Sequence, residues 1–267
     1  MRVPQPRFEA KKGRSVRLGR KIVTGVAACA LTAGVIGVAA TAGPHGYIIA
    51  GKLVASSGAC AADVWWSPNL TSWTRAHDVN DVSGSSQVVA VTEDAPGFVS
   101  VGSHNGQPAI WTSTNGTTWT TTVLPLPSGT TGVLQQIAIN GDRVAALGEQ
   151  TVAGVSMPLA PLSVNGGASW SQAPFSPPGP DAAITALTAD AGGFTAAVQS
   201  GQPGQQHVTV WTSADGASWT QRRLGGLSGG GTRQLTALAS SGSTVTGIGS
   251  IATPYSQQPV TWTFPAR

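Results

Sequence analysis

The chain has 267 residues, of which 35 are glycine, 40% are hydrophobic and only 10% are charged. This composition is typical of an all-β domain with short strands and many turns, and the length allows one large core without disulfide support. The formal net charge is +4, but eight of the 15 basic residues and one of the 11 acidic residues lie within residues 1–21. The remainder carries 7 basic and 10 acidic residues, a net charge of −3. This mildly acidic remainder argues against nucleic-acid binding.

The first 42 residues resemble an export segment. Residues 1–21 form a basic n-region, and the 19 residues from Ile22 to Ala40 carry no charge. This order is typical of a secretory signal or an N-terminal membrane anchor, so we interpret residues 22–42 in that way. Ala40-Thr41-Ala42 and Ala28-Cys29-Ala30 both offer small-residue cleavage sites, and the second also lies in a sequence that resembles a lipoprotein box. We expect an extracytoplasmic protein, secreted or anchored, whose only membrane contact is this segment.

The end of the apolar stretch has a second interpretation. Residues 35–51 match two later segments, Gln87 to Gly102 and Ala183 to Val198, in which an apolar strand, a turn and a second strand follow one another. Residues 35–41 are then the first strand of the folded domain, not the end of a membrane helix. Cleavage after Ala42 would remove that strand. The sequence leaves both interpretations open.

The stretch from Val210 to Thr220 predicts a strand, a tight turn and a strand. Its Asp215-Gly216 pair tolerates positive φ and is a strong hairpin signal. The hydroxyl of Ser213 and the Asp215 carboxylate can accept hydrogen bonds from amides of the turn. Trp219 can fold its indole back over the hairpin and bury a large apolar surface. We therefore predict a hairpin that its own side chains hold together.

This unit occurs four times, with tryptophans 46, 51 and 49 residues apart. The first copy has Leu70 where glycine is expected. The predicted structural residues of the turns are Ser67, Asn69 and Trp73; Ser113, Asn115, Gly116 and Trp119; Ser163, Asn165, Gly167 and Trp170; and Ser213, Asp215, Gly216 and Trp219.

These turns resemble the Asp-box, or BNR repeat, of sialidases and other β-propellers, whose usual pattern is Ser-x-Asp-x-Gly-x-Thr-Trp. The resemblance covers about residues 35–267 and extends to exported propeller proteins of actinobacteria. It implies an all-β fold, a β-propeller of about five four-stranded blades, with residues 43–267 as the propeller domain after the signal or anchor. It also implies that the Asp-boxes lie in outer hairpins, away from the ligand face.

Strand-like runs with alternating polarity recur in units of about 50 residues, which is typical of propeller blades. The last unit ends after its third strand, Val260 to Phe264. We expect a complete ring of five blades, and Arg14 to Gly19 could supply the missing strand from the other terminus. An open ring, or one completed by a dimer, is the alternative. The units run approximately over residues 35–80, 81–127, 128–178, 179–228 and 229–267.

A sialidase needs an arginine cluster, a tyrosine nucleophile with a carboxylate partner, and a general acid. Tyr47 and Tyr255 are the only phenols in the sequence. Arg75 and Arg222 each follow a turn tryptophan, so we expect them in outer strands. The sequence therefore argues against sialidase activity.

Other glycoside hydrolases need two carboxylates that face each other across a cleft. Asp94 and Asp190 occupy the same position of the repeat and are predicted to form turns. Glu149 follows a second strand and has no evident structural role, so we expect a solvated strand end. The full set of candidates is Asp78, Asp81, Glu93, Asp94, Glu149, Asp181 and Asp190.

No motif assigns a catalytic, metal-binding or cofactor-binding residue, and we expect no cofactor. Two cysteines give no disulfide framework, and no nucleotide-binding motif is present. The histidines have no metal-ligand spacing, although His104 and His207 could converge in a ring. The sequence predicts a non-catalytic binding or scaffold domain at the bacterial cell surface, with a protein or glycan ligand that it does not identify. The alternative is a carbohydrate-active enzyme with its site on the propeller face.

Overall fold

The computed structural model describes residues 30–31, 35–54, 60–77, 79, 84–94, 97–177, 182–202, 204–227 and 229–266. Within these residues every regular element is a β-strand, and the strands form five sheets in chain order. All strand pairs within the sheets are antiparallel. The described residues include no helix that is long and apolar enough to cross a membrane.

The sheets have the following strands. The first contains β1 (Ala30–Leu31), β2 (Val35–Gly43), β3 (Gly46–Val54), β4 (Cys60–Ser67) and β5 (Thr74–Arg75). The second contains β6 (Ser86–Asp94), β7 (Gly97–His104), β8 (Gln107–Ser113) and β9 (Thr120–Val123). The third contains β10 (Thr130–Asn140), β11 (Arg143–Val152), β12 (Val155–Leu159), β13 (Pro161–Ser163) and β14 (Ser171–Gln172). The fourth contains β15 (Ala183–Asp190), β16 (Gly193–Ser200), β17 (His207–Ser213) and β18 (Thr220–Arg222), and the fifth contains β19 (Thr232–Ser241), β20 (Thr244–Thr253) and β21 (Ser256–Pro265).

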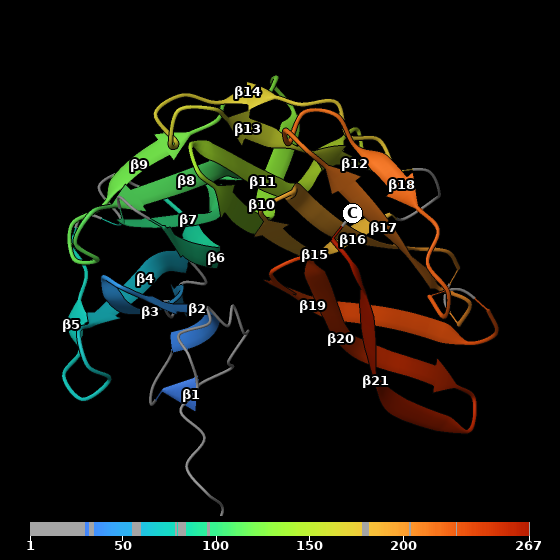
Figure 1. Ribbon diagram of the computed structural model, residues 1–267. Coiled ribbons are helices and arrows are strands. Elements are labelled where there is room, and N and C mark those ends of the chain that lie inside the picture. Colours follow the sequence, from blue (N-terminus) through green and yellow to red (C-terminus); the bar gives the residue numbers. More distant parts are fainter. Residues whose placement is uncertain are drawn as a thin grey trace, which may run out of the picture.

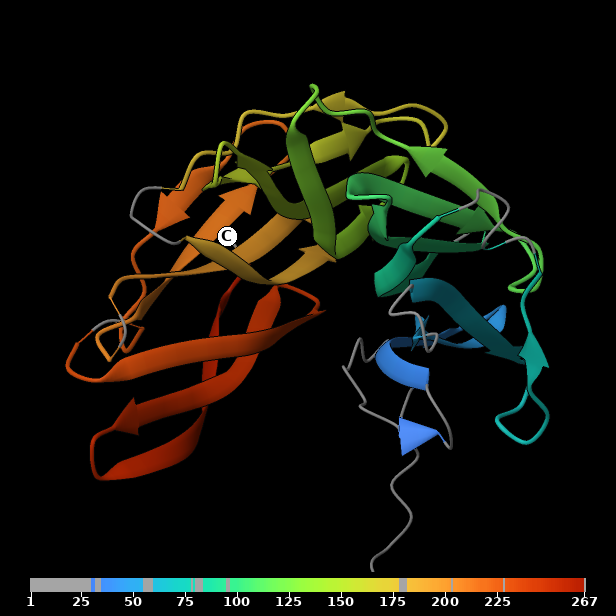
Figure 2. The same cartoon turned by 180° about the vertical axis from the view of Figure 1, so that it is seen from behind.

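Successive sheets stand side by side around a common centre (Figures 1 and 2). The inner strands contact one another in succession, β2 with β6, β6 with β10, β10 with β15 and β15 with β19. This arrangement is a β-propeller with five blades, which we number 1 to 5 in chain order, and it confirms the expected fold class. The described residues form an open arc with blades 1 and 5 at its two ends, not the complete ring that we expected.

Blades 1 and 3 differ from the expected four strands, and blade 5 lacks a fourth strand as expected of the last unit. Blade 1 gains the short β1, and blade 3 has its third strand divided into β12 and β13 at Ala160. Blade 5 has three strands, so β21 pairs with β20 alone among the described strands. Residues 14–19, the candidate closing strand, and the signal or anchor residues before Ala30 lie outside the described residues. Residues 35–41 lie in β2, which pairs with β3.

The core consists of four apolar clusters, one between each pair of neighbouring blades. Side chains alternate between the two faces of a strand, so a central blade buries both of its faces. Phe98 and Val99, neighbours in β7, show this, because Phe98 packs toward blade 1 and Val99 toward blade 3. Each inner strand also carries a β-bulge at the same place, for example between Val88 and Ala90. The blades are therefore true structural repeats.

Candidate functional site

The turn of blade 4 joins β17 to β18 and is held by its own side chains. Ser213 Oγ accepts a hydrogen bond from the amide of Gly216 at 2.8 Å, and Asp215 Oδ1 accepts one from the amide of Ser218 at 2.8 Å. This amide is the main reason that the pKa of the Asp215 carboxyl lies below its ordinary value, although partial burial opposes the shift. The indole of Trp219 donates to the carbonyl of Gly216 at 3.0 Å.

The other three turns repeat these contacts, each within its own blade. The serine hydroxyl accepts from the amide three or four residues later at 2.8 Å, and the asparagine side chain accepts from an amide at 2.9 Å. Trp119 and Trp170 donate to glycine carbonyls at 3.0 Å as Trp219 does. Trp119 is buried, whereas Trp73, Trp170 and Trp219 are half-buried. The residues of these contacts are Ser67, Asn69 and Leu70; Ser113, Asn115 and Gly116; and Ser163, Asn165 and Gly167.

Leu70 adopts a backbone conformation that favours glycine, with φ of 68°. The corresponding Gly116 and Gly216 have φ of 76° and 77°. Because a left-handed conformation strains a leucine and this side chain is 55% exposed, we expect Leu70→Gly to raise the free energy of unfolding by about 0.5–1 kcal/mol. Urea unfolding would measure it. Val164→Gly is the control, because Val164 is an exposed aliphatic residue without positive φ, and this change should lower stability. Equal losses in both variants would contradict the strain argument.

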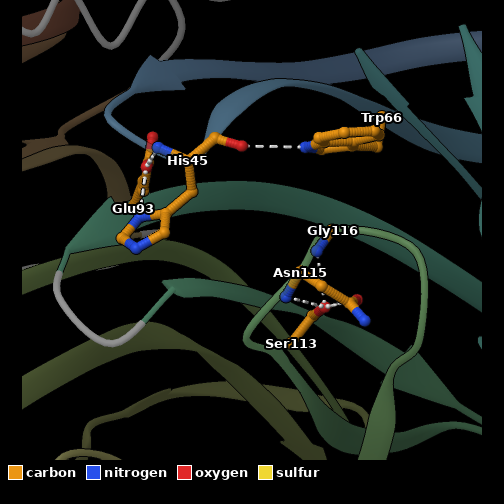
Figure 3. A network of polar contacts seen from close by, with 6 residues as sticks. All are labelled: His45, Trp66, Glu93, Ser113, Asn115 and Gly116. Atoms are coloured by element: carbon orange, nitrogen blue, oxygen red, sulfur yellow. Dashed lines mark hydrogen bonds and ion pairs between the residues drawn. The ribbon is translucent and has the colours of Figure 1, made fainter. Parts of the chain in front are cut away.

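A histidine and a glutamate join blades 1 and 2 on the side of these turns (Figure 3). His45 lies between β2 and β3, and Glu93 lies near the end of β6. Glu93 Oε1 accepts the backbone N–H of His45 at 2.6 Å and lies 2.8 Å from His45 Nδ1. The Glu93 side chain is 1% exposed and the His45 side chain is 36% exposed. The pair is therefore a charge-assisted contact at the boundary between two blades.

The second carboxylate oxygen of this pair has an unusual environment. Glu93 Oε2 is buried without a hydrogen-bond partner. It lies against Gly43, where an added Cβ would be 2.0 Å from this oxygen. A buried acceptor without a partner carries a desolvation penalty, so the bonds of the other oxygen to His45 are the main compensation for burying Glu93.

The same network extends to the turn of blade 2. The indole of Trp66, in β4, donates to the carbonyl of His45 at 2.9 Å. A Cβ added to Gly116 would lie 2.1 Å from Trp66 Cδ1, so the glycine allows the turn to approach the indole ring. Figure 3 shows Trp66 above Ser113, Asn115 and Gly116, with His45 and Glu93 beside them. These contacts fix blade 1 on blade 2.

A carboxylate that orients a histidine can support general-base chemistry. Here Glu93 is enclosed and only the ring of His45 reaches the surface. The pair can stabilise the blade boundary. Glu93 is one of the carboxylate candidates in the sequence, but no pattern pairs it with His45, because 48 residues separate them.

Two other acidic candidates, Asp190 and Glu149, have hydrogen-bond partners of their own. Asp190 accepts the amide of Gly192 at 2.6 Å, as expected of a turn former. Glu149 is not the solvated strand end that we expected, because β11 continues to Val152 and the carboxylate accepts from Gln135 at 3.2 Å and from Ser156 at 2.9 Å. The candidates whose side chains lie outside the described part are Asp78, Asp81, Asp94 and Asp181.

The histidines do not converge. His104 lies 2.7 Å from Ser86 within blade 2, and His207 lies 3.3 Å from Ser200 within blade 4. No group of three or more His, Cys, Asp and Glu residues in the described ranges could hold a metal ion. Asp63, which is buried in β4, pairs with Arg75 at 2.7 Å.

Two cavities lie between blades 2 and 3. The larger, of about 520 Å³, lies beside the turns of both blades and includes one carboxylate, that of Asp142. The smaller, of about 270 Å³, lies between the Leu124–Leu126 segment and the third strand of blade 3. Glu149 lines neither of them.

The fold is that of known β-propellers. Comparison with protein-family models gives no match, and comparison with curated proteins also gives none. Among solved structures, the chain is similar to a leech intramolecular trans-sialidase, with a TM-score of 0.51, 13% identity and coverage of 78% of this chain and 36% of that one. It is also similar to the NanB sialidase of Streptococcus pneumoniae, with a TM-score of 0.52, 10% identity and coverage of 74% and 34%.

A third similar structure is YjhT, with a TM-score of 0.51, 9% identity and coverage of 85% of this chain and 84% of that one. The chain spans only about a third of the length of the two sialidases. At these identities the likeness concerns the fold alone, a sialidase-like β-propeller.

Proposed function

We propose that this chain is an exported β-propeller that binds a glycan or protein at the cell surface and does not transform it. The observation that carries the proposal is that three acidic side chains are bound to neighbouring side chains of the fold. Glu93 is bound to His45, Asp63 to Arg75, and Glu149 to Gln135 and Ser156. A glycosidase instead needs two carboxylates about 5–9.5 Å apart across an open cleft. These three carboxylates are engaged in holding strands and blades together.

A carbohydrate-active enzyme is the second candidate, because the fold is shared with sialidases. A combined test would use the full chain on an array of neutral and sialylated glycans, in pull-down with host envelope, and with chromogenic glycosides. Retention on glycans or on envelope without glycoside turnover is the expected result. Turnover that Glu149→Gln abolishes would overturn the proposal in favour of the enzyme.

Export is proposed from the basic and apolar N-terminal segment. Because β2 pairs with β3 along residues 35–43 and contacts β6, a folded product should retain residue 35. N-terminal sequencing of the protein from the culture medium should therefore give a start near residue 31, after Ala28-Cys29-Ala30. A start at residue 43 would contradict the role of β2, and a full-length chain in the membrane would indicate an anchor.

A further inference from the structure

In blades 1 to 3 the third strand places one side chain toward the turn of the next blade, and the residue at this position of the repeat varies in size. The residues at this position are Trp66, Thr112, Leu162 and Thr212, as their pairing partners in the second strands show. In two blades the side chain is large and reaches the turn glycine of the following blade. A Cβ on Gly116 would lie 2.1 Å from Trp66, and one on Gly216 would lie 2.6 Å from Leu162.

Between blades 2 and 3 this position is occupied by the much smaller Thr112. A Cβ on Gly167, the turn glycine of blade 3, would still be 3.9 Å from Thr112 Cγ2. The cavity of about 520 Å³ lies at this boundary and is lined by both residues. Its volume falls within the range of about 300–1,000 Å³ that is usual for small-molecule sites. The substitution of a small side chain for a large one within the repeat thus accounts for the cavity.

The walls of the cavity have a distinct chemistry. Val99 and Val144, which are 7% and 1% exposed and belong to the cluster between blades 2 and 3, form an apolar base. Asn115, Thr118 and Asp142 are exposed and line its opening with an amide, a hydroxyl and a carboxylate. None of the described lining residues is basic. Hydroxyl, amide and carboxylate groups pair with the hydroxyls of a sugar, and an apolar base suits its C–H face.

We propose that this cavity binds one or two residues of a neutral saccharide. The proposal rests on the binding function inferred above and gives it a ligand class and a place. The place is the turn side of the propeller at the boundary of blades 2 and 3. Without a basic lining residue, an anionic sugar would lack a charge partner and would meet the Asp142 carboxylate. The cavity therefore favours neutral over sialylated glycans.

Saturation-transfer NMR on the full chain with cellobiose, chitobiose and mannobiose tests the proposal, with sialyllactose as the anionic probe. At least one neutral disaccharide should bind, and sialyllactose should not. Thr112→Leu fills the space as Leu162 does and should weaken binding about tenfold or more. Thr212→Leu, the same change at the same position of blade 4, is the matched control and should leave binding unchanged.

Asp142→Asn provides a second variant at an exposed position that does not risk the fold, and it should weaken binding about tenfold. Equal disaccharide binding by the wild type and Thr112→Leu, with normal melting of both, would overturn the site but leave the binding function standing. If no neutral disaccharide binds the wild type, the saccharide inference is overturned even if envelope pull-down succeeds. If neither a disaccharide nor the envelope binds the wild type, the proposed binding function is also overturned.

Discussion

Replacement of Trp119 with alanine is expected to lower the free energy of unfolding by about 3–5 kcal/mol, the usual cost of removing a large buried aromatic side chain. Trp119 is 2% exposed and belongs to the cluster between blades 1 and 2. Its ring centroid lies 6.4 Å from that of Phe98, and its indole donates to Gly116 at 3.0 Å. The alanine variant loses the packing and also the bond that closes the turn.

Trp73→Ala is the matched control, because Trp73 holds the same position in the repeat but is only half-buried. We expect a loss of about 1 kcal/mol there. Urea unfolding at neutral pH, monitored by circular dichroism so that the lost indole does not affect the signal, gives both values. Similar losses at the two sites would show that the turn alone, and not the burial between blades, determines the contribution of the tryptophan.

Much of the fold could be predicted from the sequence because the blade is a local unit. The turn at Asp215-Gly216 and its tryptophan lie within a few residues of one another, so their spacing predicts the hairpin. Alternating polarity then predicts the strands. The open arc could not be predicted in this way. Whether a ring closes depends on contacts between the first and last blades, and no local sequence pattern determines those contacts.

The features of the candidate sites depend on contacts between blades. The pairing of His45 with Glu93 joins different positions of two repeats, so aligning the repeats does not predict it. The cavity between blades 2 and 3 depends on the size of one side chain, Thr112, where other blades have Trp66 or Leu162. An alignment of the third strands could have shown this difference, but only the structure shows that the side chain faces the next turn.

If the contact between His45 and Glu93 stabilises the fold, a second substitution at Glu93 should rescue a variant that lacks the His45 side chain. A simple loss of packing would not be rescued in this way. His45→Ala leaves the Glu93 carboxylate, 1% exposed, with the backbone N–H of residue 45 as its remaining partner among those described. Since an uncompensated buried charge is costly, we expect a loss of about 3 kcal/mol in the free energy of unfolding. Adding Glu93→Leu should restore most of it, because a buried ion pair can often be replaced by apolar side chains. Blade 3 has the apolar Ile139 at the position that Glu93 holds in blade 2, so the repeat accepts an aliphatic side chain there.

The double variant should therefore be more stable than His45→Ala alone, with a total loss of about 1 kcal/mol or less. His77→Ala is the control for removal of a histidine, because His77 is exposed and its backbone bond to Thr117 is retained. The free energy of unfolding of His77→Ala should lie within about 0.5 kcal/mol of the wild-type value. If the losses of His45→Ala and Glu93→Leu simply add, the two side chains act independently. In that case Glu93 is buried for a reason other than its bond to His45, and blade 1 depends on the packing of Trp66 against Gly116 for its position.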